Sequence, residues 1–355
     1  MQDRKHFIDW IRVIAIALLI VYHVAIVFQP WGLMIGFMVN TESWESLWIP
    51  MTMLNVWRIP ILFFISGIGV FYSFKNRNWH QLLKERGQRI GIPLVFGIVF
   101  IAPVYLLMLQ NYYDWKLQYI PQASHLWFLV NILCYVILSI VPLYYLKKAS
   151  NSLFALKLQK LISSPIMYLL VIICFAIETV IANPPMYEMY ASTTHGFFLG
   201  WLAFIFGCLF AFSGEAFWNN LAKFRWPFLI LATTFFIVRL GNYLSFPQKV
   251  NLPIETCFWV FTIFAFAKQY LNIPHRLLSY SSKAAYPIYI VHMIFLGLSC
   301  SLVLPVAINV QIKFCIILTG TICGSLTCYE FIKRSKFLRI LFGISNNANS
   351  LKKTI

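Results

Sequence analysis

The sequence predicts an all-α membrane protein, a polytopic bundle of about ten transmembrane helices. Of its 355 residues, 60% are hydrophobic and only 11% are charged. The mean hydropathy of +0.75 is higher than a water-soluble core requires. The apolar residues form long continuous runs, whereas a membrane β-barrel shows short segments of alternating polarity. These observations exclude both a soluble protein and a barrel.

Ten segments are long enough to cross a hydrocarbon core at about 1.5 Å per residue. We expect one integral membrane domain over residues 1–340. The polar sequence SNNANSLKKTI predicts a disordered cytoplasmic tail within residues 341–355. The predicted spans are residues 8–28, 48–74, 92–110, 125–146, 165–183, 196–213, 227–245, 252–270, 284–304 and 312–332.

The distribution of basic residues predicts that both termini lie in the cytoplasm. In that orientation most of the 28 lysines and arginines fall on the cytoplasmic segments, as the positive-inside rule requires. Anionic lipid at this face accounts for the net charge of +17, so we expect no nucleic-acid partner. The eight cysteines fall in the apolar spans without a CxxC spacing, so we expect no bound metal and no structural disulfide.

The first span contains two ionisable residues, Arg12 and His23. Their separation of eleven residues places them within about 20° of one another and about 16 Å apart along a helix. One alternative is structural: Arg12 reaches the membrane surface and pairs with Asp9, and His23 is a hydrogen-bonded core residue without further function. Because ionisable groups in lipid are costly, their common stripe favours a functional role.

Other spans carry further polar residues. The motif NVWRIPILFFISG places Arg58 in the second span, and NLPIETCFW places Glu255 in the eighth, where it needs a partner such as Arg58 or His23. Glu178 and Arg239 are interpreted as members of structural ion pairs.

Three shorter motifs lie near the ends of spans or within them. SHLWFL places His125 beside Trp127 at an interface, where anchoring and catalysis are both open. YPIYIVH carries Tyr286, Tyr289 and His292 at three-residue spacing, on adjoining faces of a helix. KERGQRIGIP places two arginines one turn apart, which is typical either of a solvated basic loop or of a phosphate-binding fork. These arginines are Arg86 and Arg89.

Together these motifs resemble the acyltransferase-3 family. FIDWIRVIAIALLIVYH is similar to its first span, in which an arginine and a histidine flank ten residues. RIPILFFISG, SHLWFL and YPIYIVH are similar to its second, fourth and late motifs, and ERGQRIGIP resembles the glucan biosynthesis protein C branch. The resemblance covers about residues 4–336. It implies a multi-pass enzyme of the bacterial inner membrane that moves an acyl group, acetyl or succinyl, from cytoplasmic acyl-CoA to a hydroxyl of an extracytoplasmic carbohydrate.

The resemblance also implies catalytic roles. His23 becomes the catalytic histidine, acting either as a general base or as a transient acyl carrier, with Arg12 as its partner. Glu255 is expected to orient the His23 ring. Arg58 is expected to stabilise either the thioester oxyanion or the distal carboxylate of a succinyl group.

Binding residues follow in the same way. The acyl-CoA donor is expected at Arg86 and Arg89, with Tyr289 and His292, and the carbohydrate acceptor is expected at the fourth-span motif, at His125 and Trp127. Met293 follows His292 where many relatives have proline or a second histidine, so the role of His292 is left open. A homodimer is also left open as an assembly. The alternative function is a proton-coupled secondary transporter, which should show two related halves with paired broken helices.

Overall fold

The described part of the chain is helical and contains no strand. The computed structural model describes residues 5–150, 152–241 and 248–344. Within these ranges, eight helical segments are long and apolar enough to cross a membrane, or ten if each of two bent helix pairs counts as one span. The predicted fold class, a polytopic helical membrane protein of about ten spans, is confirmed. The side on which the termini lie stays a prediction.

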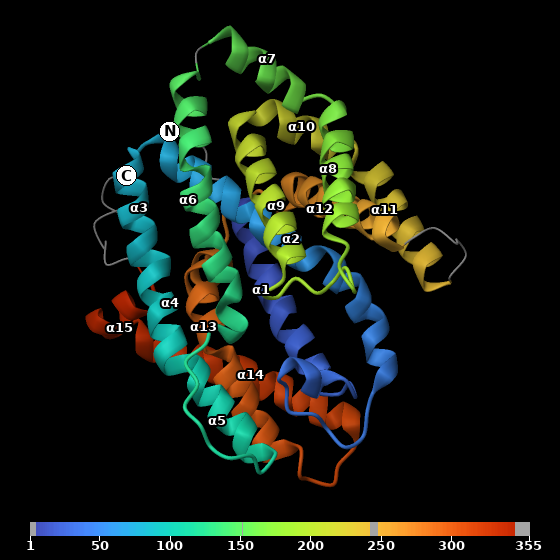
Figure 1. Cartoon of the computed structure of the whole chain (residues 1–355), viewed down its shortest axis with the longest axis vertical. Coiled ribbons are helices and arrows are strands. Elements are labelled where there is room, and N and C mark those ends of the chain that lie inside the picture. Colours follow the sequence, from blue (N-terminus) through green and yellow to red (C-terminus); the bar gives the residue numbers. More distant parts are fainter. Residues whose placement is uncertain (1–4, 151, 242–247, 345–355) are drawn as a thin grey trace. The chain divides into compact units, whose positions relative to one another are not determined.

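Figure 1 shows the helices in the order of the chain. Their bounds are α1 His6–Ile26, η1 Gly32–Ile35, η2 Glu45–Leu47, α2 Trp48–Lys75, α3 Trp79–Arg86, η3 Gly87–Gly91, α4 Ile92–Phe96, η4 Gly97–Ile101, α5 Ala102–Tyr112, η5 Ser124–Leu126, α6 Trp127–Lys148, α7 Leu153–Ile162, α8 Ile166–Ala182, α9 Thr194–Phe212, α10 Glu215–Lys223, α11 Arg225–Leu240, α12 Gln248–Tyr270, α13 Arg276–Val303, α14 Val310–Ile332 and α15 Lys336–Leu341.

Two spans begin earlier than the sequence predicted. The third starts at Trp79 and passes through two π-helical segments, η3 and η4, before it ends at Tyr112. The ninth starts at Arg276, eight residues before the predicted start at 284. In both cases the helix continues beyond the apolar core through polar residues that a hydropathy window does not count. The predicted end of the seventh span, at 245, lies outside the described residues.

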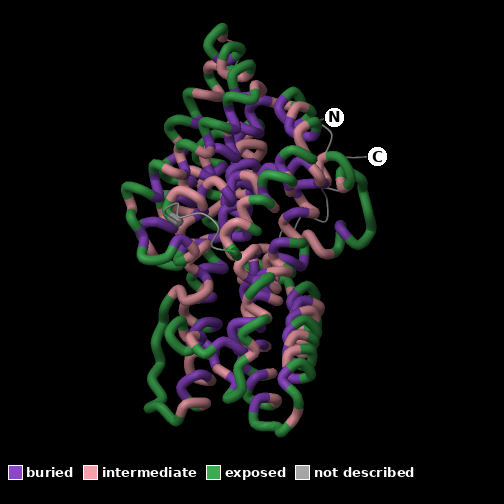
Figure 2. Tube along the Cα trace, turned by 90° about the vertical axis from the view of Figure 1, so that its right-hand side faces the viewer, coloured by how far each residue is buried: buried purple, intermediate pink, exposed green. Residues whose placement is uncertain are grey.

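The chain divides into two compact units. Unit 1 contains residues 1–15, 52–83 and 131–278, and unit 2 contains 16–51, 84–130 and 279–355. The predicted boundary between a membrane domain and a tail at residue 340 stays a prediction, because residues 345–355 lie outside the described part. In Figure 2, buried and exposed positions alternate along the helices, as expected where one face packs against protein.

Unit 1 is held together by close helix contacts at glycines. A Cβ added at Gly67 of α2 would lie 2.0 Å from the carbonyl oxygen of Phe204 in α9. A Cβ added at Gly207 of α9 would lie 2.1 Å from the carbonyl oxygen of Phe64. No other side chain fits at these crossings, so small residues set the distance between α2 and α9, as is common between membrane helices.

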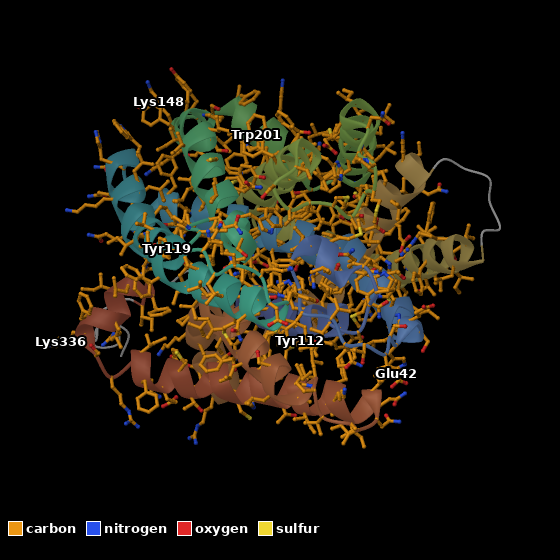
Figure 3. All side chains as sticks on the ribbon, turned by 60° about the horizontal axis from the view of Figure 1, so that its bottom comes forward. Glu42, Tyr112, Tyr119, Lys148, Trp201 and Lys336 are labelled. Carbon is orange, nitrogen blue, oxygen red and sulfur yellow. The ribbon has the colours of Figure 1, made fainter. Side chains whose placement is uncertain are left out.

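Unit 2 orders the segment that follows α1. The hydroxyls of Tyr105, Tyr112 and Tyr113 donate to the carbonyls of Gly36, Val39 and Phe37, respectively. Two of these tyrosines belong to α5, and Tyr112 marks its end in Figure 3. A buried lysine adds to the packing, since the ammonium of Lys313 donates to Asn40 Oδ1 at 3.0 Å and to the Leu304 carbonyl at 2.7 Å. These contacts fix Phe37 next to the histidines described below.

Candidate active site

Three histidines and one tyrosine come together in unit 2, and we call this group the histidine site. His23 lies in the last turn of α1, His125 in the short helix η5, and Tyr289 and His292 one turn apart in α13. The three helical elements are far apart in the sequence, so the site depends on the fold of this unit.

The central contact joins two imidazole rings. His23 Nδ1 and His292 Nε2 are 2.9 Å apart, and the rings stack at 5.1 Å with 16° between their planes. The other ring nitrogen of His292, Nδ1, lies 2.7 Å from the carbonyl oxygen of Tyr289. A carbonyl only accepts, so Nδ1 of His292 carries the proton and its Nε2 is an acceptor when the ring is neutral. His23 therefore donates from Nδ1, which leaves the lone pair of neutral His23 on Nε2.

Burial distinguishes the two rings. His292 is fully buried at 0% exposed, whereas His23 is partly exposed. The ring of Phe37 packs edge-on against His23 with 5.4 Å between centroids. Of the two stacked rings, His23 is therefore the more accessible.

His125 completes the site on the other side of His292. Its ring meets the His292 ring edge-on, with 5.3 Å between centroids and 85° between planes. Its Nε2 donates to the Ile290 carbonyl at 3.0 Å, and the Tyr289 hydroxyl donates to the carbonyl of His125. His125 Nδ1 is inaccessible and has no hydrogen-bond partner among the described residues. Trp127 instead packs beside Phe128 at the start of α6. The predicted roles of His125 and Trp127 at the acceptor stay predictions.

The two predicted phosphate-binding arginines also belong to unit 2. Arg86 ends α3, and Arg89 lies in the π-helical segment η3, a type of irregularity frequent at functional sites. Arg89 is half exposed and forms an ion pair of 3.1 Å with Glu85. Further along the same span, Gly97 packs so closely on Leu126 that an added Cβ would lie 2.3 Å from Leu126 Cδ1. Leu126 follows His125 directly, so the third span runs from the arginines to the level of the histidine site.

Unit 1 contains the other predicted catalytic residues. Arg12 Nη1 lies 3.2 Å from Asp9 Oδ1 one turn earlier in α1, which confirms the predicted pair. Arg58 is buried in α2 at 2% exposed. The catalytic roles of Arg12, Arg58 and Glu255 stay predictions, because these residues and His23 belong to different units.

Glu255 pairs with Arg239, which the sequence predicted to form an ion pair without naming its partner. Arg239 Nε lies 2.7 Å from Glu255 Oε2 and Arg239 Nη2 lies 2.9 Å from Oε1, which is a bidentate pair. Trp259 Nε1 also donates to Glu255 Oε1 at 3.3 Å. The partner of Glu255 is thus Arg239 and not the suggested Arg58 or His23; the predicted ion pairing of Arg239 is confirmed, and its structural role stays a prediction.

A second buried pair joins Glu178 to His195, a residue that sequence reasoning missed. His195 Nδ1 lies 3.0 Å from Glu178 Oε2, and its Nε2 lies 3.0 Å from the Tyr187 carbonyl. Both partners are oxygen acceptors, so the pair shares a proton between Nδ1 and the carboxylate. The hydrogen bond to Tyr187 ties the loop between α8 and α9 to this pair. Burial raises the pKa of Glu188 in the same loop. The signal was a histidine in the first turn of an apolar helix, THGFF.

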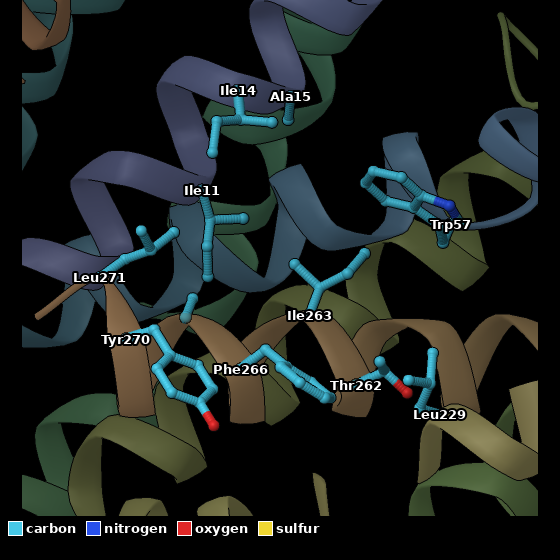
Figure 4. A pocket seen from close by; sticks show the side chains of 11 residues that line it. Ile11, Ile14, Ala15, Trp57, Leu229, Thr262, Ile263, Phe266, Tyr270 and Leu271 are labelled. Carbon is cyan, nitrogen blue, oxygen red and sulfur yellow. The ribbon is translucent and has the colours of Figure 1, made fainter. Parts of the chain in front are cut away.

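Unit 1 also holds a pocket of about 430 Å³ between α1, α2, α11 and α12. Figure 4 shows mostly apolar side chains around it, among them Ile11, Ile14 and Ile263. Such walls suit hydrocarbon, and the side-chain hydroxyls among the lining residues belong to Thr262 and Tyr270. Among the described residues, no three His, Cys, Asp or Glu side chains are placed to share a metal ion.

Comparison with known proteins identifies the family. A family model described as an acyltransferase domain matches residues 5–330. The chain belongs to this acyltransferase-3 family. It is 23% identical to glucans biosynthesis protein C of Escherichia coli K12 over 333 residues, which cover 82% of the chain and 81% of that protein. The protein of the same name from E. coli O1:K1 is 23% identical over 341 residues, with the same shares covered. No solved structure matches the chain significantly.

The tautomer of His23 in this acyltransferase predicts how its activity responds to changes at His292. His292→Ala removes the acceptor that holds the proton on His23 Nδ1, so the reactive lone pair is no longer fixed on Nε2. We expect kcat to fall at least about 100-fold, since the wrong histidine tautomer costs about 10⁴ in a Ser-His-Asp triad. His292→Gln is the matched control, because its side-chain carbonyl can accept the same hydrogen bond. Equal kcat values for the Ala and Gln variants would contradict the orienting role.

Proposed function

We propose that the protein is a membrane-bound O-acyltransferase that moves an acetyl or succinyl group from cytoplasmic acyl-CoA to a hydroxyl of an extracytoplasmic carbohydrate. The observation that carries this proposal is the chain of hydrogen bonds from the Tyr289 carbonyl through His292 to His23. That chain presents a neutral imidazole nitrogen, the form that acyl transfer requires of a general base or nucleophile.

His23 Nε2 can act by two routes. As a general base, it takes the proton of the acceptor hydroxyl while the hydroxyl oxygen attacks the thioester carbonyl. The C–S bond then breaks, the acyl group stays on the carbohydrate oxygen, and the imidazolium returns its proton to the departing thiolate. As an acyl carrier, Nε2 attacks the thioester carbonyl, the C–S bond breaks and the coenzyme A thiolate leaves. The acceptor hydroxyl then attacks the acyl group on Nε2, the N–C bond breaks, and the hydroxyl proton passes to the thiolate. In both routes His292 stabilises positive charge on the His23 ring, because its Nε2 accepts the hydrogen bond that His23 Nδ1 donates.

The donor is assigned to the arginines of the third span. The phosphates of coenzyme A suit guanidinium groups, which bind phosphate oxygens bidentately. Arg89 and Gly97 are separated by about 12 Å along the span, and Gly97 packs on the residue next to His125. A donor whose charged end stays at Arg86 and Arg89 can therefore extend a flexible arm along this span towards the histidines. The positive-inside distribution of basic residues supports a cytoplasmic donor face.

The acceptor and the location are inferred from the relatives. Their name refers to the biosynthesis of glucans, which are carbohydrates. We assign His125 and Trp127 to the acceptor, since His125 belongs to the histidine site and Trp127 begins α6 two residues later. The bacterial inner membrane is the location that agrees with a donor from the cytoplasm and an acceptor outside.

The experiment uses the purified protein in vesicles of defined orientation, with acyl-CoA on one face and glucan on the other. We expect release of CoA only when the donor is on the face that carries Arg86 and Arg89. In the double variant Arg86→Gln/Arg89→Gln, KM for acyl-CoA should rise at least about tenfold, the effect of losing one charge-assisted hydrogen bond. The value of kcat should change little, because the variant alters binding and not the reacting groups.

Lys84→Gln is the control, since it removes an exposed charge from the same segment. A drop in donor affinity equal to that of the control would assign the two arginines to ordinary surface charge. Glucan-dependent acylation without consumption of acyl-CoA would overturn the proposed donor, whereas uptake of solute without acylation would favour the transporter alternative.

A further inference from the structure

The C-terminal segment 336–344 of unit 2 packs against the third span at the level of the two arginines. Helix α15 contacts α4, and Figure 1 shows the two elements side by side. The ring of Phe342 meets the ring of Phe96 edge-on, with 5.4 Å between centroids. This segment lies beyond residue 330, where the match to the family ends.

Gly343 brings the segment into direct contact with the surroundings of Arg89. Its φ of +65° lies in the left-handed region that favours glycine. A Cβ at this position would lie 2.4 Å from the carbonyl oxygen of Arg89 and 2.9 Å from Cε1 of Tyr286. The close approach excludes any side chain at 343. It places the third span, α13 and the C-terminal segment at one point.

The Tyr286 hydroxyl at this point has no protein partner among the described residues. Its oxygen is inaccessible, and it neither donates nor accepts a hydrogen bond there. The hydroxyl is attached next to Cε1, the atom that Gly343 approaches. A buried hydroxyl without a partner costs free energy, so its presence calls for a ligand that supplies one.

Arg339 adds a third guanidinium to Arg86 and Arg89. It lies in α15 one turn before Gly343, and its carbonyl accepts the Ile344 amide at 2.8 Å, which closes the end of the helix. Its side chain is partly buried. Glu85 is paired with Arg89. The segment that carries Arg339 meets the segment that carries Arg89 at Gly343. Guanidinium groups beside a hydroxyl that can donate are the chemistry of a phosphate site.

We infer that Arg339 and the Tyr286 hydroxyl bind the phosphate groups of the donor together with Arg86 and Arg89, so that the C-terminal segment forms one wall of the donor site. The inference rests on the proposed acyl-CoA donor. It also agrees with the geometry of α13, in which Tyr286 and His292 are separated by about 9 Å along the axis. One helix thus holds a phosphate ligand at one level and the orienting histidine at the next.

The test measures binding of CoA and of pantetheine, which lacks the phosphates, to the full-length protein in phosphatidylcholine nanodiscs. Arg339→Gln should weaken CoA binding about tenfold and leave pantetheine binding unchanged. Tyr286→Phe, which keeps the ring and removes the oxygen, should weaken CoA binding several-fold. The matched control is Lys336→Gln in the same helix, an exposed cation labelled in Figure 3, which should bind CoA as the wild type does.

The outcomes separate this inference from the proposed function. Wild-type affinity for CoA in Arg339→Gln, with a loss in Arg86→Gln/Arg89→Gln, overturns the inference and leaves the acyl-CoA donor standing. Absence of CoA binding to the wild type overturns the donor itself. If Arg339→Gln changes only the response of the protein to added phosphatidylglycerol, the phosphate at this position belongs to a lipid headgroup and the inference is wrong.

Discussion

Replacing His23 by alanine is expected to abolish acyl transfer while the protein still folds. The imidazole supplies the only Nε2 lone pair that the Tyr289–His292–His23 chain presents, and both chemical routes pass through it. General-base catalysis alone is worth about 10²–10⁴-fold, and loss of a nucleophile costs the whole covalent route. The measurement is CoA release and acylated glucan, followed together in membranes with equal amounts of protein.

Two controls make this result specific. The thermal stability of His23→Ala should stay close to that of the wild type, since the residue is partly exposed. His80→Ala removes an exposed imidazole from α3 and should leave the activity unchanged. Acylation by His23→Ala at the wild-type rate would remove His23 from the mechanism.

Hydrophobic runs were sufficient to predict a bundle of about ten spans, of which, in the described part of the chain, eight are single helices and two are bent pairs. They failed where a helix continues through polar residues, as at Arg276, and where it bends. The pairs α7–α8 and α10–α11 turn by 79° and 61° at their breaks. The predicted spans correspond to α8 and α11, and a separate helix that was not predicted precedes each of them. A hydropathy window sees composition alone, whereas these bends depend on tertiary contacts.

The histidine site was only half predictable. His23, His125 and His292 were each singled out from their motifs, but the sequence assigned them to catalysis, acceptor and donor separately. Their direct contact follows from the packing of α1, η5 and α13, which no local pattern encodes. The tautomers depend on the Tyr289 carbonyl, a backbone atom that every residue possesses, so sequence reasoning had no means of identifying it.

Buried ion pairs were predictable as a class but not by partner. The cost of a charge in the membrane indicates that Glu178 and Glu255 must be paired. Which cation each would meet depends on the rotation of whole helices. His195 was overlooked because one histidine in an apolar helix is a weak signal. It lies in the first turn of α9 and contacts Glu178 near the end of the preceding helix, α8.

The second large effect is expected from the Glu255–Arg239 pair. Glu255 is 1% exposed, and Glu255→Ala leaves a partly buried guanidinium without its bidentate partner. Breaking a buried pair in this way costs about 3–5 kcal/mol. The melting temperature in detergent should fall strongly for Glu255→Ala and for Arg239→Ala. Unchanged melting in both would contradict a buried ion pair.

The double variant Arg239→Met/Glu255→Met separates stability from catalysis at this position. Two apolar side chains of similar volume avoid the cost of burying unpaired charge, so the melting temperature should recover to near the wild-type value. Activity then decides the role that the sequence predicted for Glu255. A stable double variant without turnover means that the Arg239–Glu255 pair is needed for the reaction as well as for stability. A stable double variant with normal turnover means that the pair only holds α11 and α12 together.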